Sequence, residues 1–158
     1  MLRMLGLNVT IVPERPDQPD VVQLLAELDA YQSALYPPES NHLLSIAELL
    51  DPGIHFLVAR RAGVATGCGA LRFADGYAEI KRMYVRPDQR GAGIGRAILD
   101  ALCLAAAARG VGLVRLETGI AQPEAIQLYE RAGFSRIGSF GAYPDDPLSL
   151  FYERRLEL

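Results

Sequence analysis

The feature that most constrains the fold is a glycine-rich segment, residues 84–96, which follows an apolar stretch and leads directly into an alanine-rich one. Gly91, Gly93 and Gly95 allow the backbone to turn tightly and to approach a ligand without intervening side chains. The residues after them predict a helix over 94–109, whose first amides lack partners and whose dipole is positive at that end. A strand, a glycine turn and a helix N-terminus together predict a site for a phosphate or pyrophosphate.

The spacing of this loop excludes two common nucleotide motifs. A kinase-type P-loop requires Lys and then Ser or Thr after its glycines, whereas Arg96 follows Gly95 and no hydroxyl residue comes next. A dinucleotide fingerprint requires Gly-x-Gly-x-x-Gly, and counting from Gly91 places Arg96 at the third glycine position. The loop instead follows the pattern Arg/Gln-x-x-Gly-x-Gly/Ala, through Arg90, Gly93 and Gly95.

A second segment, residues 122–134, predicts another helix. Pro123 suits its first turn and Gly133 suits its C-terminal cap. Together the two segments resemble motifs A and B of the GCN5-related N-acetyltransferases, the GNAT family. The second segment matches the family pattern Asn-x-x-Ala-x-x-Leu-Tyr-x-x-x-Gly-Phe at Ala125, Leu128, Tyr129, Gly133 and Phe134, with Gln122 where asparagine is common.

The resemblance implies that acetyl-CoA is the co-substrate. In the family, the loop amides hold the pyrophosphate of coenzyme A, and free amides of the preceding strand receive the acetyl carbonyl and the pantetheine arm. The residues implied to bind it are Met83, Tyr84, Val85, Arg90, Gly91, Ala92, Gly93, Ile94, Gly95, Arg96, Gln122 and Tyr129.

The remaining pattern predicts an α/β (α+β) protein. The expected strands are 8–12, 54–60, 64–73, 77–85, 113–118, 134–138 and one near 150–156, with a helix over 20–34 and a short one after a capping box of Ser45 and Glu48. This order resembles the GNAT fold: a mixed, mostly antiparallel, twisted sheet of six to seven strands with about four helices, splayed between the fourth and fifth strands. We expect residues 1–158 to form a single domain.

The composition limits the kinds of partner, location and metal site that we expect. Half of the 158 residues are hydrophobic, enough for a core, and a formal charge of −3 argues against nucleic acid or anionic membrane as the main partner. No apolar run reaches membrane-spanning length, and residues 1–12 lack the features of a secretory signal. Cys68 and Cys103 are too few for a disulfide framework, so we expect a protein of the reducing cytoplasm. With only His42 and His55, no metal site is expected.

The resemblance assigns two catalytic candidates. Tyr129 is the expected general acid for the leaving thiolate, because its proton is available at neutral pH. Glu79 stands four residues before Met83, where some family members place a glutamate base. Its alternative role is structural, as an ion-pair partner of Lys81 or Arg72 across the sheet. No Ser/His/Asp or Cys/His arrangement calls for an enzyme-bound acyl intermediate, so we expect direct transfer.

Two segments are expected to recognise the acceptor, residues 35–42 and 141–152, and both resemble a bacterial YsnE-like subgroup of small acetyltransferases. Their prolines favour extended paths and turns that present polar side chains. The candidate acceptor-binding residues are Tyr36, Glu39, His42, Arg72, Tyr143 and Asp145.

The expected function is transfer of an acetyl group from acetyl-CoA to a primary amine of a small, amino-acid-like acceptor. Two alternatives stay open: a protein N-terminal or lysine acetyltransferase, and a CoA-binding regulatory module without catalysis. A longer acyl donor and a homodimer, which is common among family members, also stay open.

Overall fold

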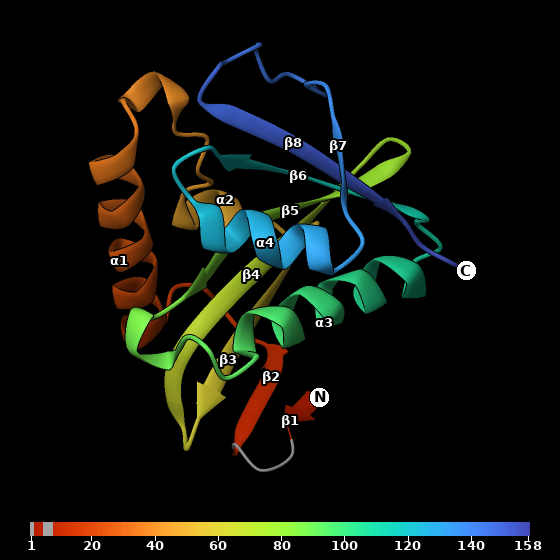
Figure 1. The fold of residues 1–158 in the computed structure, drawn as a ribbon. Helices are drawn as coiled ribbons and strands as arrows, with labels where there is room; N and C mark the ends of the chain where they lie inside the picture. Colours follow the sequence, from red (N-terminus) through yellow and green to blue (C-terminus); the bar gives the residue numbers. More distant parts are fainter. Residues whose placement is uncertain (1, 5–7) are drawn as a thin grey trace.

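The computed structural model describes residues 2–4 and 8–158, with side chains from residue 8 onward. One sheet with the strand order β1-β2-β3-β4-β5-β6-β8-β7 forms its centre (Figure 1). The strands are β1 (Leu2–Met4), β2 (Val9–Pro13), β3 (Ile54–Arg61), β4 (Val64–Ala74), β5 (Tyr77–Val85), β6 (Leu113–Gly119), β7 (Ser135–Ile137) and β8 (Ser149–Arg155). The helices are α1 (Pro19–Leu35), α2 (Ile46–Leu49), α3 (Ile94–Ala108) and α4 (Pro123–Arg131), with 3-10 turns η1 (Pro38–Ser40) and η2 (Pro87–Gln89).

The predicted fold class is confirmed. Neighbouring strands of the described chain pair antiparallel, except β5 and β6, which are parallel. The described residues form eight strands rather than six or seven, because the short β1 adds an edge strand to β2. β5 and β6 are the fourth and fifth strands of the prediction, and they splay as expected.

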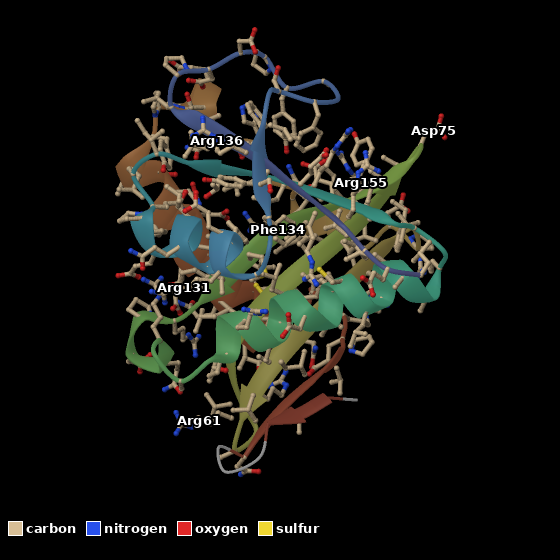
Figure 2. The ribbon with its side chains drawn as sticks, turned by 45° about the vertical axis from the view of Figure 1, so that its right-hand side comes forward. Arg61, Asp75, Arg131, Phe134, Arg136 and Arg155 are labelled. Carbon is tan, nitrogen blue, oxygen red and sulfur yellow. The ribbon has the colours of Figure 1, made fainter. Side chains whose placement is uncertain are left out.

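Helices cover both faces of the sheet, because successive side chains of a strand point to opposite faces and both sets are buried. Leu57 and Ala59 of β3 belong to a cluster with α3 and α4, whereas Phe56 and Val58 belong to a cluster with α1 and α2. Figure 2 shows the side chains that fill the space between the sheet and helices α3 and α4, with the buried Phe134 among them.

Local signals in the sequence position the elements that build the site. α2 begins with the predicted capping box, in which Glu48 N–H donates to Ser45 Oγ (3.1 Å) and Ser45 N–H donates to Glu48 Oε1 (3.0 Å). α4 begins with Pro123 and α3 begins directly after the glycine loop, both as predicted. No helix within residues 2–4 and 8–158 is long and apolar enough to cross a membrane. A single domain over 1–158 stays a prediction, and the one continuous sheet supports it.

Candidate active site

The site lies where β5 and β6 part. These strands pair over only three positions, ending at Ile80 with Leu116, after which β5 follows β4 and β6 follows β8 (Figure 1). The backbone N–H of Arg86 donates to Thr66 O of β4 (2.9 Å). Alternation then turns the amides of Met83 and Val85 away from β4 and toward the gap. Two of the three predicted strand donors are therefore free to meet a ligand, whereas the amide of Tyr84 faces β4.

A β-bulge shapes this part of β5. The pairs Cys68–Tyr84 and Ala70–Lys81 enclose one more residue on β5 than on β4. Arg82 within the bulge has a φ of 57°, a backbone conformation that costs energy for a side chain other than glycine. Its guanidinium reaches α1, where Nη1 lies 2.5 Å from Asp29 Oδ1. The ion pair holds the bulge against α1, and the bulge re-aims the residues that follow it.

The glycine loop provides an anion cradle. Gly93 is the N-cap of α3 with a φ of 85°, and no side chain caps the helix. The first intrahelical bond runs from Ala97 N–H to Gly93 O (3.0 Å), so the amides of residues 94–96 precede it. Arg90 Nε donates to Val85 O (2.9 Å), which keeps this guanidinium beside the loop. Free amides, a positive helix end and two flanking arginines, Arg90 and Arg96, suit a pyrophosphate.

One cavity of about 80 Å³, open to solvent, occupies the gap and is lined from both faces of the sheet. α1 and the segment after it form one side, and α4 forms the other. The lining side chains that matter to the chemistry below are Tyr36, Ser40, His42, Lys81, Met83, Glu117, Gln122, Tyr129 and Tyr143. The predicted residues that do not line it are Tyr84, Val85, the loop 90–96, Glu39, Arg72, Glu79 and Asp145.

Tyr129 projects from α4 into this cavity. Its side chain is only 6% exposed and packs edge-on against Phe134. Burial, and secondarily the nearby Glu117 carboxylate, raises the pKa of Tyr129 well above its ordinary value. The phenol is therefore protonated at neutral pH, as a proton donor must be.

Gln122 and Tyr36 hold each other at the same end of the cavity. The Tyr36 hydroxyl donates to Gln122 Oε1 (3.1 Å) and accepts from Ala121 N–H (3.1 Å). This hydroxyl occupies the space that a side chain at Gly119 would need, because a Cβ there would lie 1.8 Å from Tyr36 Oη. A predicted cofactor residue and a predicted acceptor residue are thus in direct contact.

Glu79 is fully buried and its carboxylate is surrounded by partners. Oε1 lies 2.5 Å from Arg72 Nη2, the Tyr143 hydroxyl donates to Oε2, and Lys81 Nζ lies 3.6 Å from Oε2. This is the ion pairing that was the alternative to a catalytic role. The base role of Glu79 stays a prediction, since the carboxylate does not line the cavity.

Lys81 connects that buried network to the cavity. Its Nζ donates to His42 O (2.8 Å) and to Tyr143 Oη (2.7 Å). Burial lowers the pKa of Lys81, partly offset by the neighbouring Glu79. The rings of His42 and Tyr143 also contact each other, with their centroids 5.1 Å apart. His42 and Tyr143 therefore belong to one wall of the cavity.

The two predicted acceptor segments meet across the cavity. Ser40 Oγ donates to Asp146 Oδ2 (2.6 Å), and Asp146 Oδ1 accepts from Leu148 N–H (2.9 Å). Asp145 points elsewhere and accepts from Ser139 Oγ (2.8 Å), and Glu39 is exposed. Of the six predicted acceptor residues, Tyr36, His42 and Tyr143 therefore reach the cavity.

Glu117 is the residue that sequence reasoning missed. It lines the cavity from β6, and Ser149 Oγ donates to its Oε2 (2.9 Å). Burial raises the pKa of Glu117 to about 7. The available signal was a carboxylate near the C-terminal end of the strand predicted over 113–118. Within the described chain, no group of three or more His, Cys, Asp or Glu side chains is placed to hold a metal ion.

Known proteins share this architecture. Residues 52–136 match the family model of the acetyltransferase (GNAT) domain. The chain is 51% identical over 151 residues to the IAA acetyltransferase of Azospirillum brasilense, covering 94% of this chain and 99% of that protein. It is 35% identical over 139 residues to the uncharacterized N-acetyltransferase YsnE of Bacillus subtilis (strain 168), covering 86% and 92%.

Solved structures agree with the fold. A protein from Klebsiella pneumoniae assigned as an acyl-CoA N-acyltransferase has a TM-score of 0.80 and 36% identity, with 94% of this chain and 98% of that chain covered. The PaiA N-acetyltransferase of Thermoplasma acidophilum, solved in complex with coenzyme A, has a TM-score of 0.75 at 18% identity, with 93% and 98% covered. At that lower identity, the likeness concerns the fold alone.

Proposed function

The chain belongs to the GNAT family of acetyl-CoA-dependent N-acetyltransferases, as its glycine loop and second motif predicted, and from this premise we propose that it acetylates the primary amine of a small, amino-acid-like molecule. One observation carries the proposal. A single cavity passes through the gap between β5 and β6, with Tyr129 on one side and a polar wall on the other. The side with Tyr129 suits acetyl-CoA, and the polar wall suits an amine.

The residues present fit acetyl-CoA as the co-substrate. The amides of residues 94–96 and the side chains of Arg90 and Arg96 would hold the pyrophosphate, since nothing caps this helix end. The free amides of Met83 and Val85 would receive the pantetheine arm and the acetyl carbonyl. One such donor contributes roughly 3 kcal/mol to stabilising a developing oxyanion. Tyr129 would supply a proton to the leaving thiolate.

The acceptor wall supports a small molecule over a protein. The Ser40–Asp146 hydrogen bond and the Lys81 contact with His42 O join both acceptor segments into one continuous wall. A long open groove for a polypeptide would require these segments to part. Lys81 and Glu117 line the same cavity and would complement the carboxylate and the ammonium of an amino-acid-like acceptor. We place the enzyme in the cytoplasm, where its two free, buried cysteines stay reduced.

The test combines thiol release from acetyl-CoA across amino acids, other amines and short peptides with calorimetric binding of CoA. Release with free amino acids or small amines is the expected result. Release with peptides alone would replace the small acceptor with a protein. Tight CoA binding without any acceptor-dependent release would favour a regulatory module.

A further inference from the structure

We propose that Glu117 is the general base that deprotonates the acceptor ammonium, an inference that rests on the proposed acetyl transfer. The strand register places it. Ile80 and Leu116 form the last pair of β5 with β6, so Lys81 and Glu117 come next, on the same face, at the point where the strands part. Glu117 lines the cavity there.

Glu117 and Tyr129 approach the gap from opposite faces of the sheet. Leu116, the neighbour of Glu117, belongs to the cluster under α3 and α4, together with Tyr129. Alternation along β6 therefore directs Glu117 to the other face, on the side of α1. The amine would be deprotonated on one face of the sheet and the thiolate would leave on the other, which is the geometry of a direct displacement.

The carboxylate of Glu117 is free to accept a proton, unlike that of Glu79. Among the described residues, Glu117 accepts one side-chain hydrogen bond, from Ser149 Oγ. Glu79 is fully buried outside the cavity and is bound by Arg72, Tyr143 and Lys81. Glu79 is thus the counter-charge of Arg72 and Lys81 and accepts a hydrogen bond from Tyr143, and Glu117 is the carboxylate that an acceptor in the cavity meets.

The charged and titratable groups around Glu117 come from each neighbouring element. They are Lys81 and Glu79 of β5, Tyr36 after α1, Tyr129 of α4, and Tyr143 and Asp146 of the segment before β8. Burial raises the pKa of Glu117 to about 7, and Lys81 partly opposes this. A carboxylate with this pKa is half ionised at neutral pH, and it binds a proton strongly enough to take one from an ammonium group.

The reaction balances with these two residues. Glu117 removes one proton from the ammonium, and the nitrogen lone pair forms a C–N bond with the thioester carbonyl carbon. The C–S bond breaks and its electron pair leaves with the sulfur, which takes a proton from Tyr129. The second proton of the nitrogen restores the Tyr129 phenol, and Glu117 releases its proton to water. The sum is ammonium plus thioester giving amide, thiol and one proton.

The experiment compares pH profiles of kcat for the wild type and the variants Glu117→Gln, Glu117→Asp and Glu79→Gln, with Glu157→Gln as an exposed control. The probe is acetyl-CoA with the best amine of the acceptor panel. We expect wild-type kcat to fall below about pH 7, in proportion to the ionised base. Glu117→Gln should lower kcat about 100-fold or more and abolish that acidic limb, with unchanged acetyl-CoA affinity.

Two further readouts separate a base from a structural residue. A hydrazide acceptor is unprotonated throughout the range, so the loss in Glu117→Gln should shrink with it. Glu117→Asp should keep the acidic limb at intermediate kcat, which holds even if the glutamine variant folds poorly. An acidic limb that persists in Glu117→Gln, or vanishes in Glu79→Gln alone, overturns the assignment. A wild type that binds CoA but releases no thiol with any amine removes the acetyl transfer itself.

Discussion

Replacing Gly119 with alanine should damage the site through one residue, Tyr36. An added Cβ would lie 1.8 Å from Tyr36 Oη and 2.1 Å from Cζ, far inside contact distance, so the buried ring must move. Its hydroxyl would then lose the bonds to Gln122 Oε1 and from Ala121 N–H, which contribute about 1 kcal/mol each.

The expected loss of stability follows from these contacts. Overpacking adds about 1–3 kcal/mol, and the lower backbone entropy of alanine returns about 0.5–1 kcal/mol. Gly119→Ala should therefore reduce the free energy of unfolding by about 2–4 kcal/mol. With a urea m-value of about 2 kcal/mol per molar, the unfolding midpoint falls by about 1–2 M.

The assay is urea unfolding of four proteins: wild type, Gly119→Ala, Tyr36→Ala and the double variant. In the Tyr36→Ala background the three atoms nearest the added methyl, all of the Tyr36 ring and hydroxyl, are gone, so Gly119→Ala should cost less than about 0.5 kcal/mol there. Gly138→Ala is the matched control, because a Cβ at this exposed glycine meets no atom within 4 Å. Wild-type stability of Gly119→Ala, or an undiminished loss in the double variant, would refute the reasoning.

Three other predictions follow from the same geometry. Tyr129→Phe should lower kcat about 100-fold with little change in acetyl-CoA affinity, measured by steady-state thiol release and calorimetry. If chemistry is rate-limiting and kcat does not change, Tyr129 is not the general acid. Gly93→Val should abolish calorimetric CoA binding by blocking the loop, whereas Gly76→Val, at the same φ of 85° in a hairpin turn, should cost similar strain and leave CoA binding intact. Burial raises the pKa of Glu117 from 4.5 to about 7, so the folded chain binds that proton more tightly and loses stability as pH rises between these values. Glu117→Gln should therefore be more stable than the wild type at pH 8, by up to about 3 kcal/mol, and equally stable at pH 4 in urea unfolding.

Most of the fold could be predicted from local sequence patterns. The capping box at Ser45 and the glycine loop each specify their conformation through residues close in sequence, and the structure has both where predicted. Motif B likewise begins and ends its helix through Pro123 and the glycine that follows. Such signals are readable because their physical cause is short-range.

The rest depends on contacts between distant residues. Nothing in the sequence marks the bulge at Arg82, which lacks the glycine that usually permits a positive φ. Whether Glu79 or Glu117 meets the cavity depends on the register of β5 with β6, formed by strands more than 30 residues apart. The partner of Ser40 lies 106 residues away, so sequence alone could single out the segment around Asp146 but not that bond.

The origin of the cavity walls has an evolutionary consequence. The parts suited to acetyl-CoA come from one continuous stretch, from Met83 in β5 to Tyr129 in α4. The acceptor wall is assembled mainly from two segments outside that stretch, around His42 and Tyr143, which touch each other without belonging to any strand or α-helix. Insertions or substitutions in these two segments can change which amine is accepted while the donor half is inherited intact. We expect a change of acceptor to involve both segments together, because the hydrogen bond between Ser40 and Asp146 joins them.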